Sequence, residues 1–237
     1  MESIDRIPEA FSRTARVWGE DAVANLADAR VAVFGVGGVG GHLCEALARA
    51  GVGQIDLIDR DTVSLSNLNR QIVALHSTLG QPKVEVMRAR ILDINPACRV
   101  TVHEMFYLPE TADSIDLSVF DYVADAVDTV AAKIELVLRC QAARVPLICA
   151  MGAGNKCHPE QFRIADLFRT NTDPLARVLR RELGERGISN SPDRDFIFPD
   201  TGFKISRICC AVMLFLHSRS ILSCAFLPSV SAESRPP

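Results

Sequence analysis

Short apolar runs alternate with longer segments of helical periodicity over most of this 237-residue chain. Val31–Phe34 is one such run, and because it ends at a glycine it is typical of a buried parallel strand. Gly40–Ala50, which follows, has apolar residues on one helical face. Strands that alternate with helices predict an α/β fold, with a doubly wound, mainly parallel sheet and helices on both faces. The same alternation predicts further strands at Gln54–Ile58, Arg99–His103, Tyr122–Ala126 and Val145–Ala150, and further helices at Lys83–Ile94 and Val130–Ala143.

The two ends of the chain depart from this alternation. Residues 13–29 are predicted to form an N-terminal helical segment that leads into the first strand. Near the other end, Asp173 and Pro174 open one more helix, because aspartate caps helices and proline is favoured at the first helical position. After that helix the regular pattern is lost. We therefore expect one domain over residues 1–187 and an atypical C-terminal segment, partly loop or disordered, over residues 188–237.

The composition is that of an ordinary soluble globular protein, with 48% hydrophobic and 23% charged residues. The formal net charge of −3 gives no global sign of nucleic-acid binding, so any RNA site must be a local patch. Residues 1–20 lack the apolar core of a signal peptide, and Ile208–Leu216 is too short to cross a bilayer, so no membrane association is expected. The eight cysteines form no C-x-x-C pair, which argues against structural zinc and favours reduced thiols in a cytoplasmic protein.

A glycine-rich turn separates the first predicted strand from the helix that follows it. Gly35, Gly37, Gly38 and Gly40 lie within the pattern G-x-G-x-x-G. Its first glycine permits a tight turn, its second lets the backbone approach a phosphate, and its last packs helix against strand. The free N–H groups of the helix then face the anion. Asp59, at the end of the second strand, stands where an acidic residue accepts hydrogen bonds from ribose, so the sequence predicts a nucleotide on a Rossmann-type domain.

The segment after Asp59 changes which nucleotide is expected. The glycines and the acid alone favour NAD, as in an oxidoreductase. However, Asp61–Gln71 forms a polar loop that an NAD enzyme does not need. Arg70 within this loop and Lys83 beyond it put two cations near the turn, which suits a triphosphate better than a pyrophosphate.

Two carboxylates follow the fourth predicted strand, at the crevice where open α/β sheets bind ligands. They are Asp125 and Asp128. A carboxylate beside a triphosphate is the usual means of holding Mg²⁺. The sequence therefore predicts ATP and Mg²⁺ as the bound groups.

Five segments together form a pattern that resembles a known group of proteins: Gly35–Gly40, Ile58–Asp61, Ser66–Gln71, Lys83 and Asp125–Asp128. Over about residues 13–187 the chain resembles the ThiF/MoeB-like superfamily, which has the fold of ubiquitin-activating enzymes. The Asn-Arg-Gln element, residues 69–71, is specific to this superfamily.

The resemblance implies a role for each of the matching residues. It implies that Asp59 binds ribose and that Asp128 serves Mg²⁺ and the adenylation step. In this superfamily an arginine near the N-terminus reaches the partner subunit's ATP site; Arg16 matches it, which implies a homodimer. The phosphate and ATP ligands implied in the same site are Asp61, Asn67, Arg70, Gln71 and Lys83.

Three further segments resemble the tRNA threonylcarbamoyladenosine dehydratase branch: Arg13–Arg16, Met151–Lys156 and Asp173–Leu183. Such an enzyme is implied to adenylate the threonylcarbamoyl carboxylate of a modified tRNA adenosine, after which an internal nucleophile closes a ring. A sulfur-transfer protein is implied as a further partner. Two alternatives stay open. One is adenylation of the C-terminal glycine of a ubiquitin-like sulfur carrier, although the usual zinc C-x-x-C pairs are absent. The other is an inactive nucleotide-binding protein, because the C-terminal segment departs from the family.

The helix that begins at Pro174 has a basic face. Arg177, Arg180 and Arg181 are spaced i, i+3 and i+4, so their guanidinium groups are expected on one side, with Glu182 elsewhere on the helix. Such a face can follow RNA phosphates even on a mildly acidic protein. A solvated helix face is the alternative, and the resemblance favours RNA.

Overall fold

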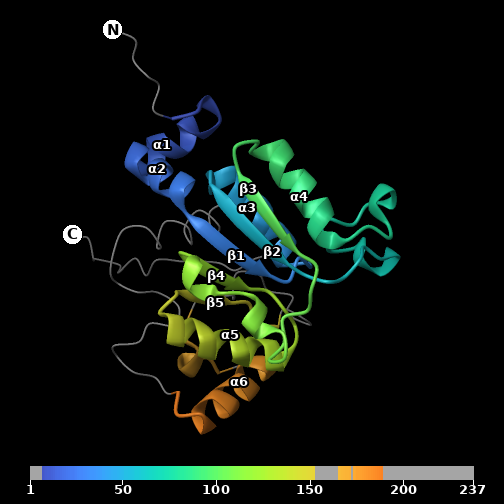
Figure 1. Cartoon of the computed structure of the whole chain (residues 1–237), viewed down its shortest axis with the longest axis vertical. Helices are drawn as coiled ribbons and strands as arrows, with labels where there is room; N and C mark the ends of the chain where they lie inside the picture. Colours follow the sequence, from blue (N-terminus) through green and yellow to red (C-terminus); the bar gives the residue numbers. More distant parts are fainter. Residues whose placement is uncertain (1–6, 153–164, 172, 189–237) are drawn as a thin grey trace, which may run out of the picture.

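The computed structural model describes residues 7–152, 165–171 and 173–188 (Figure 1). The predictions for the C-terminal segment from Ser189 onward, and for the part of the Met151–Lys156 motif beyond Gly152, lie outside the described residues.

Five parallel strands form one sheet, in the order β3-β2-β1-β4-β5. The order reverses between β1 and β4, whose carboxyl ends flank the glycine-rich turn, and this is where open α/β sheets bind ligands. The predicted Rossmann-type fold is therefore confirmed. The strands are β1 (Arg30–Phe34), β2 (Gln54–Ile58), β3 (Arg99–His103), β4 (Tyr122–Asp125) and β5 (Leu147–Cys149).

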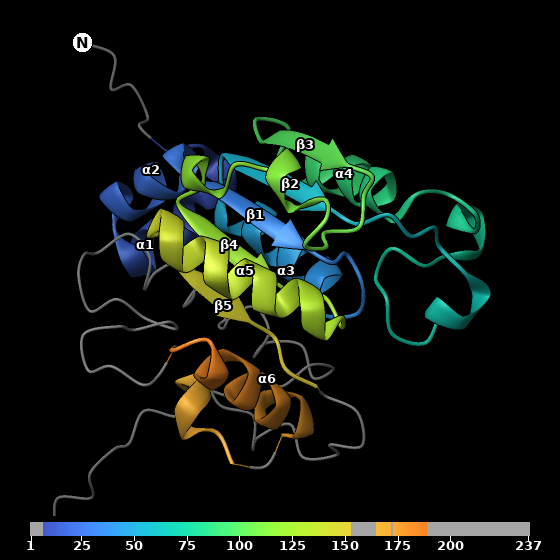
Figure 2. The same cartoon turned by 60° about the horizontal axis from the view of Figure 1, so that its bottom comes forward.

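Helices cover the sheet on both sides (Figures 1 and 2). On one side, α3 (Gly40–Ala50) and α4 (Lys83–Ile94) bury a core that includes Leu47, Ile55 and Met87. On the other, α5 (Val130–Ala143) and α6 (Pro174–Glu185) bury a second core against β1, β4 and β5. Leu179 and Leu183 are members of this second core, so α6 is part of the domain.

The N-terminal segment is two helices and not one. Gly19 adopts a φ of 87°, which ends α1 (Ser12–Trp18) and begins α2 (Glu20–Asp28). α2 buries Ala22, Val23 and Leu26 and leads directly into the amino end of β1. The connection from β3 to β4 contains only short 3₁₀ turns, at Ala112–Ser114 and Leu117–Val119. Further 3₁₀ turns within the described residues lie at Glu9–Phe11, Leu65–Asn67, His76–Thr78 and Leu167–Arg169.

The start of α6 follows the predicted capping chemistry. Asp173 Oδ1 accepts a hydrogen bond from the Ala176 amide at 2.9 Å, and Pro174 occupies the first turn. Among the described residues, no helix is long and apolar enough to cross a membrane. The described cysteines are free thiols; Cys44, Cys98 and Cys140 are buried, and Cys149 is half-buried.

Candidate active site

The glycine-rich turn is a place where three backbone segments meet too closely for side chains. Gly35 has a φ of +86°, and a Cβ there would lie 2.7 Å from the Ala126 carbonyl oxygen. A Cβ on Gly40 would lie 1.8 Å from the Gly35 carbonyl oxygen. The turn therefore requires glycine at both positions, as the sequence predicted. It leaves the amino end of α3 facing the carboxyl edge of the sheet, where helix N–H groups favour an anion.

Asp59 shapes this turn from the end of β2. Its Oδ2 accepts a hydrogen bond from the Val36 amide at 2.7 Å, and its Oδ1 accepts one from the Asp61 amide at 2.8 Å. Each carboxylate oxygen can accept a second hydrogen bond. The half-buried Asp59 thus orients the turn and retains acceptor capacity for a ligand hydroxyl.

Residues 62–82, the lobe, extend from the carboxyl edge of the sheet as a closed loop (teal in Figure 1). The neck of the lobe is a bridge between Thr62 and Pro82, next to a 2.9 Å hydrogen bond from the Lys83 amide to the Asp61 carbonyl. Val63 and Val73 fix the lobe to the core beside α3 and α4. The position of the lobe relative to the turn is therefore set at its base.

Lys83 lies at this neck with its ammonium group beside the open edge. Its Nζ donates to Asp61 Oδ2 at 2.7 Å; the Lys83 side chain is 6% exposed and that of Asp61 is 52% exposed. A lysine held in this way has its aliphatic part buried and its charge directed by one carboxylate. Among the described residues, Asp61 is the only hydrogen-bond acceptor of this ammonium group, which leaves it donors for a ligand.

The lobe places its polar side chains over the turn. Atoms of Arg70 and Gln71 lie 3.6 Å and 3.8 Å from where Cβ atoms on Gly38 and Gly37 would stand. The exposed Arg70 Nη1 donates to the Ser66 carbonyl oxygen at 2.9 Å.

Two polar side chains of the lobe, Asn67 and Gln71, are buried. The Asn67 side chain accepts the Ser64 amide at 3.1 Å and so closes the 3₁₀ turn in the lobe. The buried Gln71 Oε1 has no hydrogen-bond donor among the described residues, which is costly in a closed protein interior. The structure therefore brings Arg70 and Gln71 to the turn, with Asn67 as a support of the lobe. Lys83 pairs with Asp61, whose amide is bound by the same Asp59 that orients the turn.

One expectation at the end of β4 is wrong. Asp125 does not face a ligand: it is fully buried, and Lys133 Nζ donates to both of its oxygens at 3.0 Å. Burial raises the pKa of the Asp125 carboxyl, against the opposing effect of Lys133. Asp128, three residues later, is exposed just before α5 begins, and Thr129, not Asp128, is the N-cap of that helix. Of the two carboxylates, Asp128 is the one exposed to solvent.

Lys133 was missed by reasoning from the sequence. A lysine in a helix is normally solvated. Lys133 pairs with Asp125, which lies eight residues earlier and outside the helix, so the spacing rules for side-chain pairs within a helix do not predict the contact. The available signal was its position among the apolar residues Ala132, Ile134 and Val137, which indicates a buried side chain.

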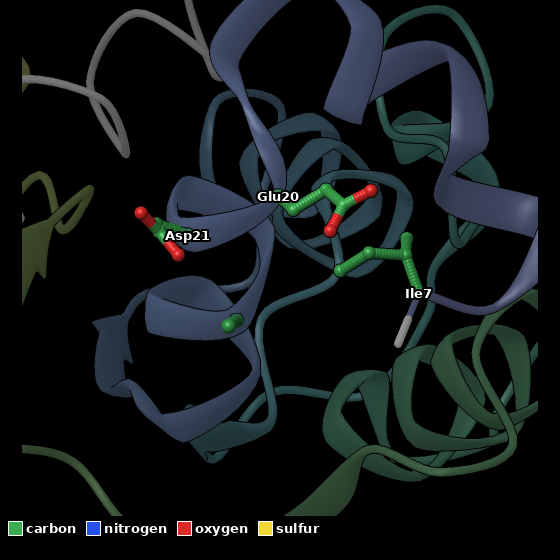
Figure 3. A pocket seen from close by; sticks show the side chains of 4 residues that line it. Ile7, Glu20 and Asp21 are labelled. Carbon is green, nitrogen blue, oxygen red and sulfur yellow. The ribbon is translucent and has the colours of Figure 1, made fainter. Parts of the chain in front are cut away.

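Arg16 is exposed on α1, away from the glycine-rich turn. The preceding Phe11 contacts Gly51 at the carboxyl end of α3, whereas the turn lies at the amino end of that helix. Within one chain, the structure therefore does not bring Arg16 to the other site residues. A shallow hollow near these N-terminal helices, lined by Ile7, Glu20, Asp21 and Ala24, is likewise remote from the turn (Figure 3).

The three arginines of α6 differ in their surroundings. Arg177 is exposed. Arg180 is half-buried and donates to the Leu167 carbonyl oxygen at 3.4 Å and to the Thr170 hydroxyl. Arg181 pairs with Glu182 at 2.8 Å, so Glu182 lies closer to the basic face than its position in the sequence indicated.

The comparisons with known proteins agree with this geometry. Residues 11–192 match the model of the ThiF family. The tRNA threonylcarbamoyladenosine dehydratase of Bacillus subtilis (strain 168) is 50% identical over 178 residues, which are 75% of this chain and 70% of that protein. The enzyme of the same name from Escherichia coli (strain K12) is 45% identical over 175 residues, which are 74% of this chain and 65% of that protein.

Solved structures of E. coli tRNA N6-threonylcarbamoyladenosine dehydratase, TcdA, have the same fold. The complex with ATP has a TM-score of 0.76 at 35% identity and covers 92% of this chain and 98% of its own. The complex with AMP has a TM-score of 0.75 at 41% identity and covers 83% of this chain and 81% of its own.

Proposed function

Since this chain belongs to the ThiF family, we propose that it is an ATP-dependent enzyme that adenylates the carboxylate of threonylcarbamoyladenosine in tRNA and so drives its cyclisation. The observation that carries this proposal is the glycine-rich turn at the switch point of the sheet, with Arg70 packed over it and Lys83 linked to it through Asp61 and Asp59. Two relatives at 45–50% identity bear the name of this activity, and solved TcdA structures contain ATP and AMP.

The chemistry requires a good leaving group on a carboxylate. The carboxylate oxygen attacks the α-phosphorus of ATP, pyrophosphate leaves, and the acyl adenylate forms. An internal nucleophile of the same modified base then attacks the acyl carbon, and AMP departs with the former carboxylate oxygen, so that water is lost overall. The protein contributes positioning and neutralisation of phosphate charge. In this proposal the turn amides, Arg70 and Lys83 bind phosphates, with Asn67 and Gln71 from the lobe, and Asp59 and Asp61 complete the ATP site.

Asp128 is the residue that would hold Mg²⁺. It is an exposed carboxylate next to the turn, whereas Asp125 is buried and paired with Lys133. Within the described residues there is no cluster of three or more carboxylate, histidine or cysteine side chains that could hold a metal. A single carboxylate fits Mg²⁺, which commonly takes one or two protein ligands together with substrate phosphates and water.

Arg16 completes the site from a second copy of the chain in this proposal. Its exposure, and the placement of α1 away from the turn of its own subunit, support an action across a homodimer. Mixing inactive Arg16→Ala with inactive Asp128→Ala protein should restore part of the activity, because one site of a mixed dimer retains both groups. Absence of recovery while subunits demonstrably exchange would refute the arrangement.

Arg177, Arg180 and Arg181 form the proposed RNA face. The exposed Arg177 is its most accessible member, while Arg180 also supports the 167–170 turn. Arg177→Glu should weaken tRNA binding and lower the slope of log affinity against log salt by roughly 0.7–0.9, the value for one phosphate contact. Arg181→Ala, which removes an arginine already paired with Glu182, should change the slope less. Equal slopes in the wild type and in Arg177→Glu would contradict the assignment.

The decisive experiment is a reaction of the purified protein with tRNA that carries threonylcarbamoyladenosine, ATP and Mg²⁺. The expected result is AMP together with a tRNA nucleoside lighter by one water, detected by mass spectrometry. Pyrophosphate exchange that depends on a ubiquitin-like sulfur carrier instead of tRNA would favour the alternative substrate. No exchange with either substrate would favour a nucleotide-binding protein without activity.

We also propose that the protein works in the cytoplasm and that a sulfur-transfer protein is a further partner.

A further inference from the structure

The buried ion pair of Asp125 and Lys133 connects the elements that surround the nucleotide turn. Asp125 is the last residue of β4, and Lys133 lies in the first turn of α5. Besides its two bonds to Asp125, Lys133 Nζ donates to the Ala150 carbonyl oxygen at 2.8 Å, just after β5 ends. All three ammonium protons thus have acceptors, and one side chain joins β4, β5 and α5.

The Asp125 carboxylate in turn fixes the backbone that follows it. Its Oδ1 accepts a hydrogen bond from the Val127 amide at 3.1 Å. The Ala126 amide donates to the Phe34 carbonyl oxygen at 2.7 Å, immediately before Gly35. Residues 126–128 are therefore held from two sides.

The segment held in this way is the one against which the glycine-rich turn packs. The Ala126 carbonyl oxygen and the Val127 nitrogen are the atoms that a Cβ on Gly35 would strike, at 2.7 Å and 3.0 Å. The Ala126 side chain would meet a Cβ on Gly40 at 3.2 Å. A shift of this segment would move the turn on one side and Asp128 on the other.

We propose that Asp125 and Lys133 are positioning residues: they lock residues 126–128 and thereby set the Asp128 carboxylate relative to the glycine-rich turn. This inference rests on the proposed function for its catalytic readout. The pair has a solvation cost that an apolar pair would avoid, since replacing a buried ion pair by apolar residues of similar volume is often neutral or stabilising. Stability alone therefore does not require this pair at the carboxyl edge of the sheet.

The test replaces the pair by apolar residues and separates position from stability. In Asp125→Leu/Lys133→Met the melting temperature should stay near that of the wild type, while kcat for AMP formation falls roughly 100-fold, the cost of a misplacement of about 1 Å. KM for ATP should change by less than about threefold, because ground-state binding by the turn amides and the lobe remains. Asp125→Asn/Lys133→Met keeps an acceptor for the Val127 amide and should regain at least about tenfold in kcat.

A control removes another ion pair that is distant from the turn and has only its carboxylate fully buried. Arg30 and Asp56 are 2.9 Å apart, near the amino end of β1 and in the middle of β2. Arg30→Met/Asp56→Leu should leave kcat unchanged. Full kcat in Asp125→Leu/Lys133→Met, or a loss confined to KM, would overturn the positioning role.

A second readout works without catalysis and so separates failure of this inference from failure of the proposed function. The Val127 amide should exchange with solvent deuterium roughly tenfold faster in Asp125→Leu/Lys133→Met, in line with the loss of one hydrogen bond. If that variant does not fold, exchange of the Val127 amide in the wild type tests the inference. An amide protected as well as those of β4 supports the lock, and one that exchanges like an exposed loop overturns it.

Discussion

Two lysine–aspartate pairs lie at the carboxyl edge of the same sheet, and they differ in what surrounds them. In the closed pair, Lys133 and Asp125 are both fully buried and all the donors of the lysine are used. In the open pair, Lys83 is buried but Asp61 is 52% exposed, and the lysine retains donors on the ligand side. The comparison shows that the same two residue types form a fully enclosed pair after one strand and a partly exposed pair after another, and in the proposed function only the exposed pair meets the ligand.

The largest expected effect comes from breaking the closed pair on one side only. Lys133→Met leaves a buried, unpaired carboxylate and should lower the free energy of unfolding by about 3–5 kcal/mol, measured by urea unfolding. Lys83→Met leaves the exposed Asp61 in water and should cost less than about 1 kcal/mol. Equal losses in the two variants would remove the distinction between the pairs.

The next effect concerns Asp128, the exposed carboxylate that lies three residues after Asp125 of the closed pair. Asp128→Ala should lower the rate of AMP formation by about 10²–10³-fold, as for loss of a group that stabilises transition-state charge. Because Thr129 is the helix N-cap, stability should change by no more than about 0.5 kcal/mol. The exposed Asp93 on α4 serves as the control, and Asp93→Ala should keep full activity. Near-normal turnover by Asp128→Ala would exclude it from the mechanism.

Lys83→Met tests whether the lysine of the open pair acts on the substrate or on stability. The variant should lose about 10- to 100-fold in kcat/KM, the worth of hydrogen bonds to a charged group, although its stability is nearly unchanged. Arg88→Met, which removes an exposed cation of the same helix paired with Glu85, should have no effect. If Lys83→Met were instead unstable and fully active when folded, the open pair would be structural.

The smallest effect is expected for the carboxylate of the open pair. Asp61→Asn keeps the backbone bond from the Lys83 amide and removes only the charge that orients its ammonium group. KM for ATP should rise about 1.4- to fivefold, which corresponds to the 0.2–1 kcal/mol of a solvent-exposed ion pair. Steady-state kinetics at several ATP concentrations measures this, and a change in kcat with constant KM would indicate a different role.

The pattern of apolar runs predicted several elements with their bounds, and the reason lies in the residues that interrupt it. The helix Gly40–Ala50 was predicted correctly because glycines precede and follow it, and Lys83–Ile94 because Pro82 and Asn95 flank it. The predicted strands Tyr122–Ala126 and Val145–Ala150 were too long at their ends. There the backbone turns to pack against Gly35 or to bind Lys133, and no local propensity reports such contacts.

The candidate site divides in the same way. The sequence indicated Gly35 and Gly40 because a close approach of backbone segments requires glycine, and the structure shows these contacts. Spacing alone could not separate Asp125 from Asp128, and only the family resemblance singled out Asp128. In the structure the difference arises because Lys133 pairs with Asp125. The contact that distinguishes them is the tertiary ion pair between Asp125 and Lys133. Lys133 lies in α5, a helix that the sequence predicted only from its periodicity.

The neck of the lobe has a consequence for how this protein can change. Residues 62–82 leave and rejoin the domain at one point, the bridge between Thr62 and Pro82, so the entropy of closing that loop depends only weakly on its length. Doubling a flexible loop costs roughly 0.6 kcal/mol. Insertions near the exposed Leu75 and His76 would therefore lengthen the lobe while the sheet folds as before. The lobe, which carries Arg70 and Gln71, is thus free to diversify independently of the sheet.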